Sequence, residues 1–158
     1  MPPAAYPDPN RLRAANINPA TGLATDYLNH YNEVAMLIAT LADMPEMSDM
    51  ILDWRPVGYP RHFLRSGFGD KGLAIAAWVL AERHVKQQFR LACDEVESSI
   101  SAVQYKLSSA PGSAAEIAAE AGPIFEGIAR IGGVINGGKA ASLLERSAAQ
   151  DLVDSLFD

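Results

Sequence analysis

A long stretch without proline constrains this chain more than any other feature. No proline occurs between Pro60 and Pro111, and apolar side chains recur every three or four residues from Leu73 to Leu107. That spacing places them on one face of a helix. Asp70 stands where an aspartate caps a helix, because its side chain accepts hydrogen bonds from the free amides of the first turn. The pattern predicts one long helix over about 70–108.

The length of this predicted helix has a consequence for packing. A helix over 70–108 would be about 60 Å long at 1.5 Å per residue. The whole chain has 158 residues, and a compact domain of that size has a radius of gyration of about 15 Å. We therefore expect the helix to protrude, to bend or to pack along a partner.

The remaining sequence also carries helical patterns and lacks a strand pattern. Apolar residues at spacings of three and four from Leu23 to Leu41 predict a helix over about 20–42, with Asn18 as its cap. Further helix starts are indicated by two capping-box patterns and by a short segment between prolines and glycines. These are Asp43 with Glu46, Ser113 with Glu116, and the turn of helix from Arg61 to Arg65.

The predicted fold class is all-α, an antiparallel helical bundle built around one long helix (about 70–108), with an extended Pro-rich N-terminal arm. Five of the ten prolines fall within the first 19 residues, and proline fixes φ and removes an amide donor. Four segments follow from these patterns. They are an extended arm over 1–17, a helical bundle domain over 18–131, a Gly-rich hinge over 132–139, and an amphipathic helix over 140–158. Within the bundle domain, we expect Pro123 to kink or end, near Gly122, the helix that Ser113 opens.

Composition excludes several classes of function. The net charge of -6 argues against a general nucleic-acid binder, because phosphates attract basic proteins. One cysteine, Cys93, excludes a disulfide within the chain and a cysteine-based zinc site, and we expect it to be a small buried residue. The longest apolar run, 72–81, is far shorter than the ~20 residues that a membrane-spanning helix needs. We expect no membrane segment and a cytoplasmic location, since the N-terminus also lacks a secretory pattern.

Basic and aromatic side chains alternate in the segment 54–71. The charge over 55–90 is +5, whereas the flanks 1–54 and 91–158 carry -5 and -6. Arginine forks suit carboxylates and phosphates, so one hypothesis is a loop that binds an anion or an acidic peptide. The favoured alternative is a connector whose aromatic rings fill the core and whose arginines pair with the acidic flanks. The candidate ligand-binding residues are Arg55, Arg61, His62, Arg65 and Lys71.

A weaker hypothesis is a carboxylate and histidine metal site. Asp26, His30 and Glu33 form one row of the predicted 20–42 helix. Metal sites in helical bundles take Glu-x-x-His from two helices, whereas this chain has only the reversed order, once. A half-buried His30 bonded to a neighbour is the favoured interpretation, and we predict no bound metal.

No catalytic motif is complete in the sequence. Residues 133–139 match the first part of a phosphate-binding loop, but Ala140 stands where a serine or threonine would hold magnesium, and no strand precedes the loop. A glycine linker is the favoured interpretation, and the serine-hydrolase pattern G-x-S-x-G is absent.

The sequence therefore favours a non-catalytic helical protein-interaction or accessory subunit without a cofactor. We expect it to be oligomeric and to bind a protein partner or a second copy of itself, with no role in binding nucleic acid or membrane. The alternative is a helical bundle that binds an anionic small molecule or acidic peptide through 54–71. The metal site is the third hypothesis.

Overall fold

The chain forms helices throughout the residues that its computed structural model describes, 6–109 and 113–137. In these residues the only strand-like pairing is a single antiparallel bridge between Ile17 and Ala24. The predicted all-α class is confirmed. The elements are α1 (Pro9–Ala14), η1 (Thr25–Leu28), α2 (Asn29–Ala39), η2 (Pro45–Met47), α3 (Ser48–Asp53), α4 (Tyr59–Arg65), α5 (Lys71–Leu80), α6 (Arg83–Ser109), α7 (Ala114–Ala118) and α8 (Ala121–Ile135).

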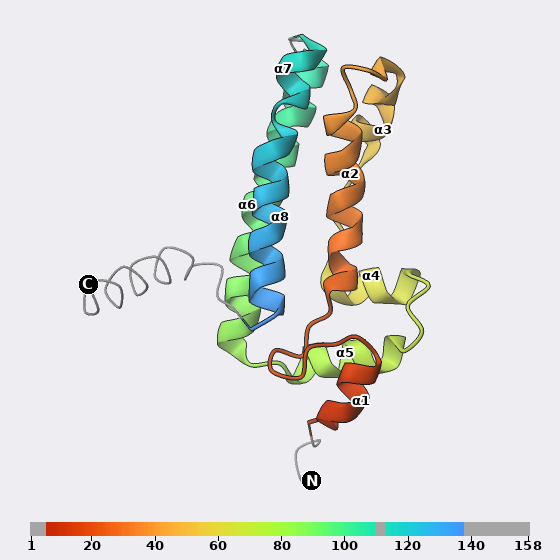
Figure 1. The fold of residues 1–158 in the computed structure, drawn as a ribbon, viewed down its shortest axis with the longest axis vertical. Coiled ribbons are helices and arrows are strands. Elements are labelled where there is room, and N and C mark those ends of the chain that lie inside the picture. The colour runs from red at the N-terminus through yellow and green to blue at the C-terminus, as the bar shows by residue number, and fades with distance from the viewer. Residues whose placement is uncertain (1–5, 110–112, 138–158) are drawn as a thin grey trace, which may run out of the picture.

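Helices α6, α8 and α2 form the bundle along the long axis of the molecule (Figure 1). α6 and α8 run antiparallel and make the most extensive helix contact, and α2 packs against both. Glycine permits the closest approach, because a Cβ atom on Gly127 of α8 would lie 2.8 Å from Cγ2 of Val96 on α6. Apolar side chains such as Ile38, Ile100 and Ile131 are fully buried between these helices.

The predicted long helix is present, but it begins at Arg83. The chain turns at Ala81, whose backbone is extended (φ -61°, ψ 146°), so residues 71–80 form the separate helix α5. Asp70 caps α5 as predicted, since its side chain accepts a hydrogen bond from the Leu73 amide. The turn allows Trp78 to stack on Tyr59 of α4, with ring centroids 4.7 Å apart. A single rod over 70–108 is therefore corrected to two helices.

The predicted 20–42 helix is shorter, because residues 17–24 form a tight loop instead. Asn18 does cap a turn by accepting from the Ala20 amide at 2.8 Å, but the chain then bends back at Gly22, whose φ is +77°. The loop is held to the bundle by Thr21, whose hydroxyl donates to the Ile135 carbonyl at 2.6 Å. The helical backbone therefore starts at η1 and continues into α2.

The prediction of an extended arm over 1–17 is wrong for its second half. Asp8 caps α1 by accepting from the Asn10 amide, and Pro9 occupies the first turn, where no amide donor is needed. The helix forms because Leu12 is fully buried against the core. Residues 1–5 lie outside the described residues.

The predicted helix caps and helix ends outside the long helix are confirmed in part. Ser113 accepts from the Glu116 amide as predicted, whereas the N-cap of η2 is Met44, and the side-chain cap expected of Asp43 is absent there. The helix that Ser113 opens, α7, ends at Ala118, shortly before Gly122, and Pro123 lies in the first turn of the next helix, α8. Residues 132–135 of the predicted hinge continue α8, and the segment 140–158 lies outside the described residues.

Across the parts of the chain that the structure covers, none of the helices combines the length and the apolarity that crossing a membrane requires.

Candidate functional site

An aromatic and histidine cluster lies where η1, α2, α4 and α6 meet. Tyr27 is at its centre, and five rings have their centroids 4.6–5.5 Å from the ring of Tyr27. These five belong to His30, Tyr31, Tyr59, His62 and Phe89. Edge-on contacts such as that between Tyr27 and Tyr31 are a favourable arrangement of aromatic rings. The cluster fixes the position of both histidines relative to the bundle.

Hydrogen bonds from the tyrosines fasten two loops to this cluster. The Tyr27 hydroxyl donates to the Val57 carbonyl at 2.7 Å and lies 3.2 Å from the Tyr31 hydroxyl. The Tyr59 hydroxyl accepts from the Ala24 amide at 2.9 Å. Burial raises the pKa of all three phenols, so their hydroxyls remain protonated at neutral pH. Their role in this arrangement is to position the loops.

His62 forms the polar contact of the cluster. Its Nε2 donates to Oδ2 of Asp26 at 3.0 Å, and Asn29 donates to the other carboxylate oxygen at 3.2 Å. The contact joins α4 to η1, and the carboxylate of Asp26 is thereby oriented by two side chains. Asp26 then presents its remaining surface to a cleft.

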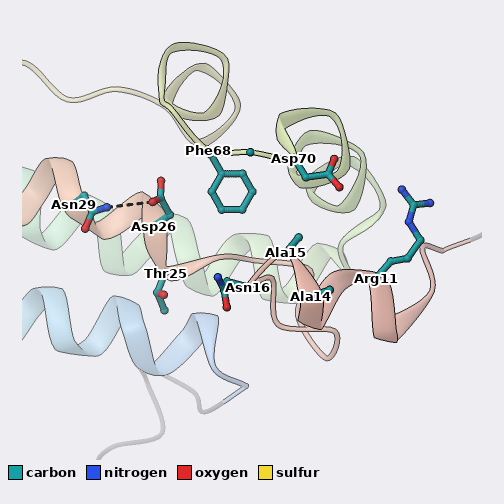
Figure 2. A pocket seen from close by; sticks show the side chains of 10 residues that line it. Arg11, Ala14, Ala15, Asn16, Thr25, Asp26, Asn29, Phe68 and Asp70 are labelled. Carbon is teal, nitrogen blue, oxygen red and sulfur yellow. Dashed lines mark hydrogen bonds between the residues drawn. The ribbon is translucent and has the colours of Figure 1, made fainter.

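The cleft beside Asp26 has a volume of about 850 Å³ (Figure 2). The ring of Phe68 lies between the carboxylates of Asp26 and Asp70, and Arg11 lies beyond Asp70. The cleft thus presents both signs of charge and one aromatic ring, which suits a polar ligand with a small apolar part. The remaining lining residues are Ala14, Ala15, Asn16, Thr25, Asn29 and Gly69.

His30 confirms the interpretation of a half-buried histidine bonded to a neighbour. Its Nδ1 donates to the Tyr27 carbonyl at 2.7 Å, and its own carbonyl accepts from the Trp54 indole at 3.1 Å. Burial, together with nearby His62, lowers the pKa of His30 to about 4. His30 is therefore neutral at pH 7. Its Nε2 is buried with no hydrogen-bond partner among the residues described.

The three residues of the metal hypothesis do not converge. Asp26 faces His62, His30 is bonded to the backbone, and Glu33 is exposed on α2. Within 6–109 and 113–137, no group of three or more histidine, cysteine, aspartate or glutamate side chains is placed to hold a metal ion.

The five candidate ligand-binding residues are spread over three locations. Arg55 donates to the carbonyls of Leu52 and Trp54, at the end of α3. Lys71 donates to the Leu64 carbonyl at 3.4 Å. The remaining three lie on α4, where His62 faces Asp26 and the other two are exposed. Those two are Arg61 and Arg65.

The connector hypothesis for 54–71 holds for the aromatic rings. Tyr59 and Phe63 are buried in the core, as that hypothesis requires. The predicted pairing of its arginines with the acidic flanks is wrong, since no arginine of this segment lies within ion-pair distance of a carboxylate in the described parts. The basic side chain of the segment that does contact a carboxylate is His62, beside Asp26. No local sequence pattern predicts the contact between His62 and Asp26, because the two residues are 36 positions apart in the chain.

A second, smaller cavity of about 310 Å³ lies along α6. Cys93 and Glu97 line it together with aromatic rings of the cluster. Burial raises the pKa of the Cys93 thiol to about 12, so the thiol is protonated and poorly nucleophilic at neutral pH. Burial and nearby Asp94 also raise the pKa of Glu97. The sequence had indicated a buried Cys93, which is confirmed, but no motif had indicated Glu97.

In comparisons with known proteins, no family model matches this chain, and neither a curated protein nor a solved structure matches it.

Proposed function

We propose that this chain is a non-catalytic helical interaction or accessory subunit, which binds a protein partner or a second copy of itself through the outer face of α5. The observation that carries the proposal is the composition of α5. Its sequence, KGLAIAAWVL, contains only one charged residue, Lys71. A helix that is apolar on all sides is normally buried on all sides.

The outer face of α5 is nevertheless exposed. Val79 is 64% exposed, Ala76 is exposed, and Ile75 and Leu80 are only partly buried. The inner face is used for folding, because Leu73, Ala74 and Ala77 are buried there. Leu64 on the neighbouring helix α4 is also exposed and apolar. Ala76 and Val79 are three positions apart and thus neighbours on one face of α5, and exposed apolar surface of this kind marks interaction sites.

The division of the predicted rod changes the argument for a partner. A rod over 70–108 would have required a companion along its length, whereas α6 is covered by α8 and α2. Support now comes from α5, at the end of the bundle (Figure 1). A cytoplasmic location remains part of this proposal, on the basis of a single buried cysteine and no cysteine pair.

Sedimentation velocity over a range of protein concentrations tests the proposal. We expect the parent chain to associate with itself, or to retain a partner through purification, and Val79→Glu to lose that association. Leu91→Glu is the matched control, because Leu91 is 67% exposed on α6. A parent chain that stays monomeric and retains no partner overturns the proposal, and so does equal loss of association in the two variants.

A second candidate function is the binding of an anionic small molecule or acidic peptide by the 54–71 segment. Arg61 and Arg65 favour it, because they are exposed one helical turn apart and lack ion pairs in the described parts. A thermal-shift screen with phosphorylated and carboxylated compounds tests it. Stabilisation that disappears in both Arg61→Ala and Arg65→Ala supports this function, and stabilisation that survives both variants contradicts it.

A further inference from the structure

Methionines gather at the end of the bundle where α2 turns into α3. Four of the five methionines of the chain lie between residues 36 and 50. Three of them, Met44, Met47 and Met50, follow one another at intervals of three through η2 and the start of α3. This spacing determines how their side chains lie relative to one another.

The backbone places the three methionines along one side of the turn. The Met47 amide donates to the Met44 carbonyl at 3.0 Å, which closes the first turn of η2 with Met44 at its N-cap and Met47 at its end. Met47, at the N-cap of α3, and Met50 in its first turn are likewise three positions apart, and such neighbours on a helix have Cβ atoms about 5–6 Å apart. The methionine side chain is long and unbranched, so its sulfur can reach towards that of a methionine three positions away.

Burial in the core does not account for these residues. Met44 is 39% exposed and Met50 is 51% exposed, whereas Met47 is partly buried. A thioether at the surface contributes little to stability, since its apolar atoms stay in water. The sulfurs of Met44 and Met50 are thus available to a ligand.

The surroundings of the three methionines attract cations. Asp43, Glu46 and Asp49 alternate with them and are exposed. None of these carboxylates forms an ion pair within residues 6–109 and 113–137. A local excess of negative charge raises the concentration of cations at the surface.

We propose that Met44, Met47 and Met50 bind one soft monovalent metal ion, Cu(I), through their thioether sulfurs. Soft thioether ligands select Cu(I) over the harder divalent ions, which prefer carboxylate and imidazole ligands. Thioethers carry no proton to displace, so the ion binds without proton release and without a change of oxidation state. The carboxylates supply neutralising charge. The one thiol of the chain, Cys93, is buried on α6 and is not part of the site.

Titration with silver nitrate in chloride-free buffer tests the site, because Ag(I) is a redox-stable probe for Cu(I). We expect one equivalent to bind and to shift the methyl NMR signals of Met44, Met47 and Met50. Each single change to leucine should weaken binding by about tenfold or more, since loss of even a supporting contact of a metal site has an effect of that size. Leucine conserves volume and apolar character, so the fold is retained.

Two control variants keep the proposal falsifiable. Met36→Leu removes an exposed methionine of α2 that lies outside the series, and it should leave Ag(I) affinity unchanged. Cys93→Ala should also leave it unchanged. The proposal is overturned if no ion binds, if Cys93→Ala abolishes binding, or if the triple leucine variant binds as tightly as the parent. An anaerobic competition for Cu(I) against a colorimetric chelator should give the same order of variants, and a different order contradicts the site.

Discussion

The Nε2 atom of His62 lies 3.0 Å from Oδ2 of Asp26, in a contact that joins α4 to η1. The side chains are 12% and 33% exposed, respectively, so the contact is only partly shielded from water. It is also one of the contacts that hold the basic segment 54–71 beside the cleft of Figure 2.

We expect Asp26→Ala to lower the free energy of unfolding by about 1 kcal/mol, because a hydrogen bond to a charged group is lost at a partly exposed position. Urea denaturation at pH 7 measures the change. Glu82→Ala is the matched control, since Glu82 lies 3.1 Å from His84 but both side chains are exposed. Equal destabilisation by the two variants would show that the contact between Asp26 and His62 has no special weight.

The buried imidazole of His30 predicts a pH dependence of stability. Its pKa in the folded chain is about 4, below the ordinary value of 6.5. Between these values the unfolded chain binds a proton that folded His30 does not, so the free energy of unfolding falls as pH drops from 6.5 towards 4. Above pH 6.5 the histidine is neutral in both states and has no effect.

Chemical denaturation of the parent and of His30→Leu at pH 7 and pH 5 measures this effect. We expect the parent to lose more stability between the two pH values than the variant, in which the titrating group is absent. Comparing each chain with itself cancels the cost of the lost bond to the Tyr27 carbonyl. An identical loss in both chains would mean that His30 is protonated in the folded state at pH 5.

The helices that the sequence predicts best are those with a long apolar rhythm. The spacing around Val96 and Ile100 predicts α6, because that face packs on α8 and α2. The turn at Ala81 could not be predicted, since neither glycine nor proline marks it. It accompanies a long-range contact, in which Trp78 stacks on Tyr59. The spacing of apolar residues along the chain does not predict contacts between distant segments.

The sequence predicts some residues of the candidate site but not which of them contact one another. The segment 54–71 does supply rings to the core and His62 to a polar contact. Its partner Asp26 lies in η1, whereas the apolar spacing from Leu23 to Leu41 predicts a regular helix that carries Asp26 with His30 and Glu33. The chain around Asp26 is a 3-10 helix and not an α-helix, because the chain bends back at Gly22 and the α-helix begins only at Asn29. Sequence spacing therefore grouped the wrong residues around Asp26.

The cap of α5 gives a third prediction. The Asp70 side chain accepts from the Leu73 amide, and removing such a cap costs about 1 kcal/mol. We expect Asp70→Ala to lower the midpoint of urea denaturation and Asp70→Ser to retain most of the stability, since serine also caps helices. If the serine variant is as unstable as the alanine variant, the loss arises from the charge of Asp70 rather than from its cap.

The contact between α6 and α8 supplies the last prediction, which compares two glycines of one helix. A Cβ on Gly127 would lie 2.8 Å from Cγ2 of Val96, whereas a Cβ on Gly133 would meet nothing within 4 Å. Val96 is buried and branched, so it cannot swing away. We expect Gly127→Ala to destabilise the chain by about 1–3 kcal/mol through overpacking. Gly133→Ala should stabilise it by up to about 1 kcal/mol, because alanine favours helix.

A double-mutant cycle separates the clash from other effects of Gly127→Ala. Val96→Ala alone should destabilise the chain, because it leaves a cavity in the core. Combined with Gly127→Ala, it removes the methyl group that the new Cβ would strike. The two changes should then cost less together than the sum of their separate costs, measured as free energies of unfolding. Strict additivity would mean that the α6–α8 contact has room for a side chain at residue 127, and that the close approach of the two helices does not depend on glycine.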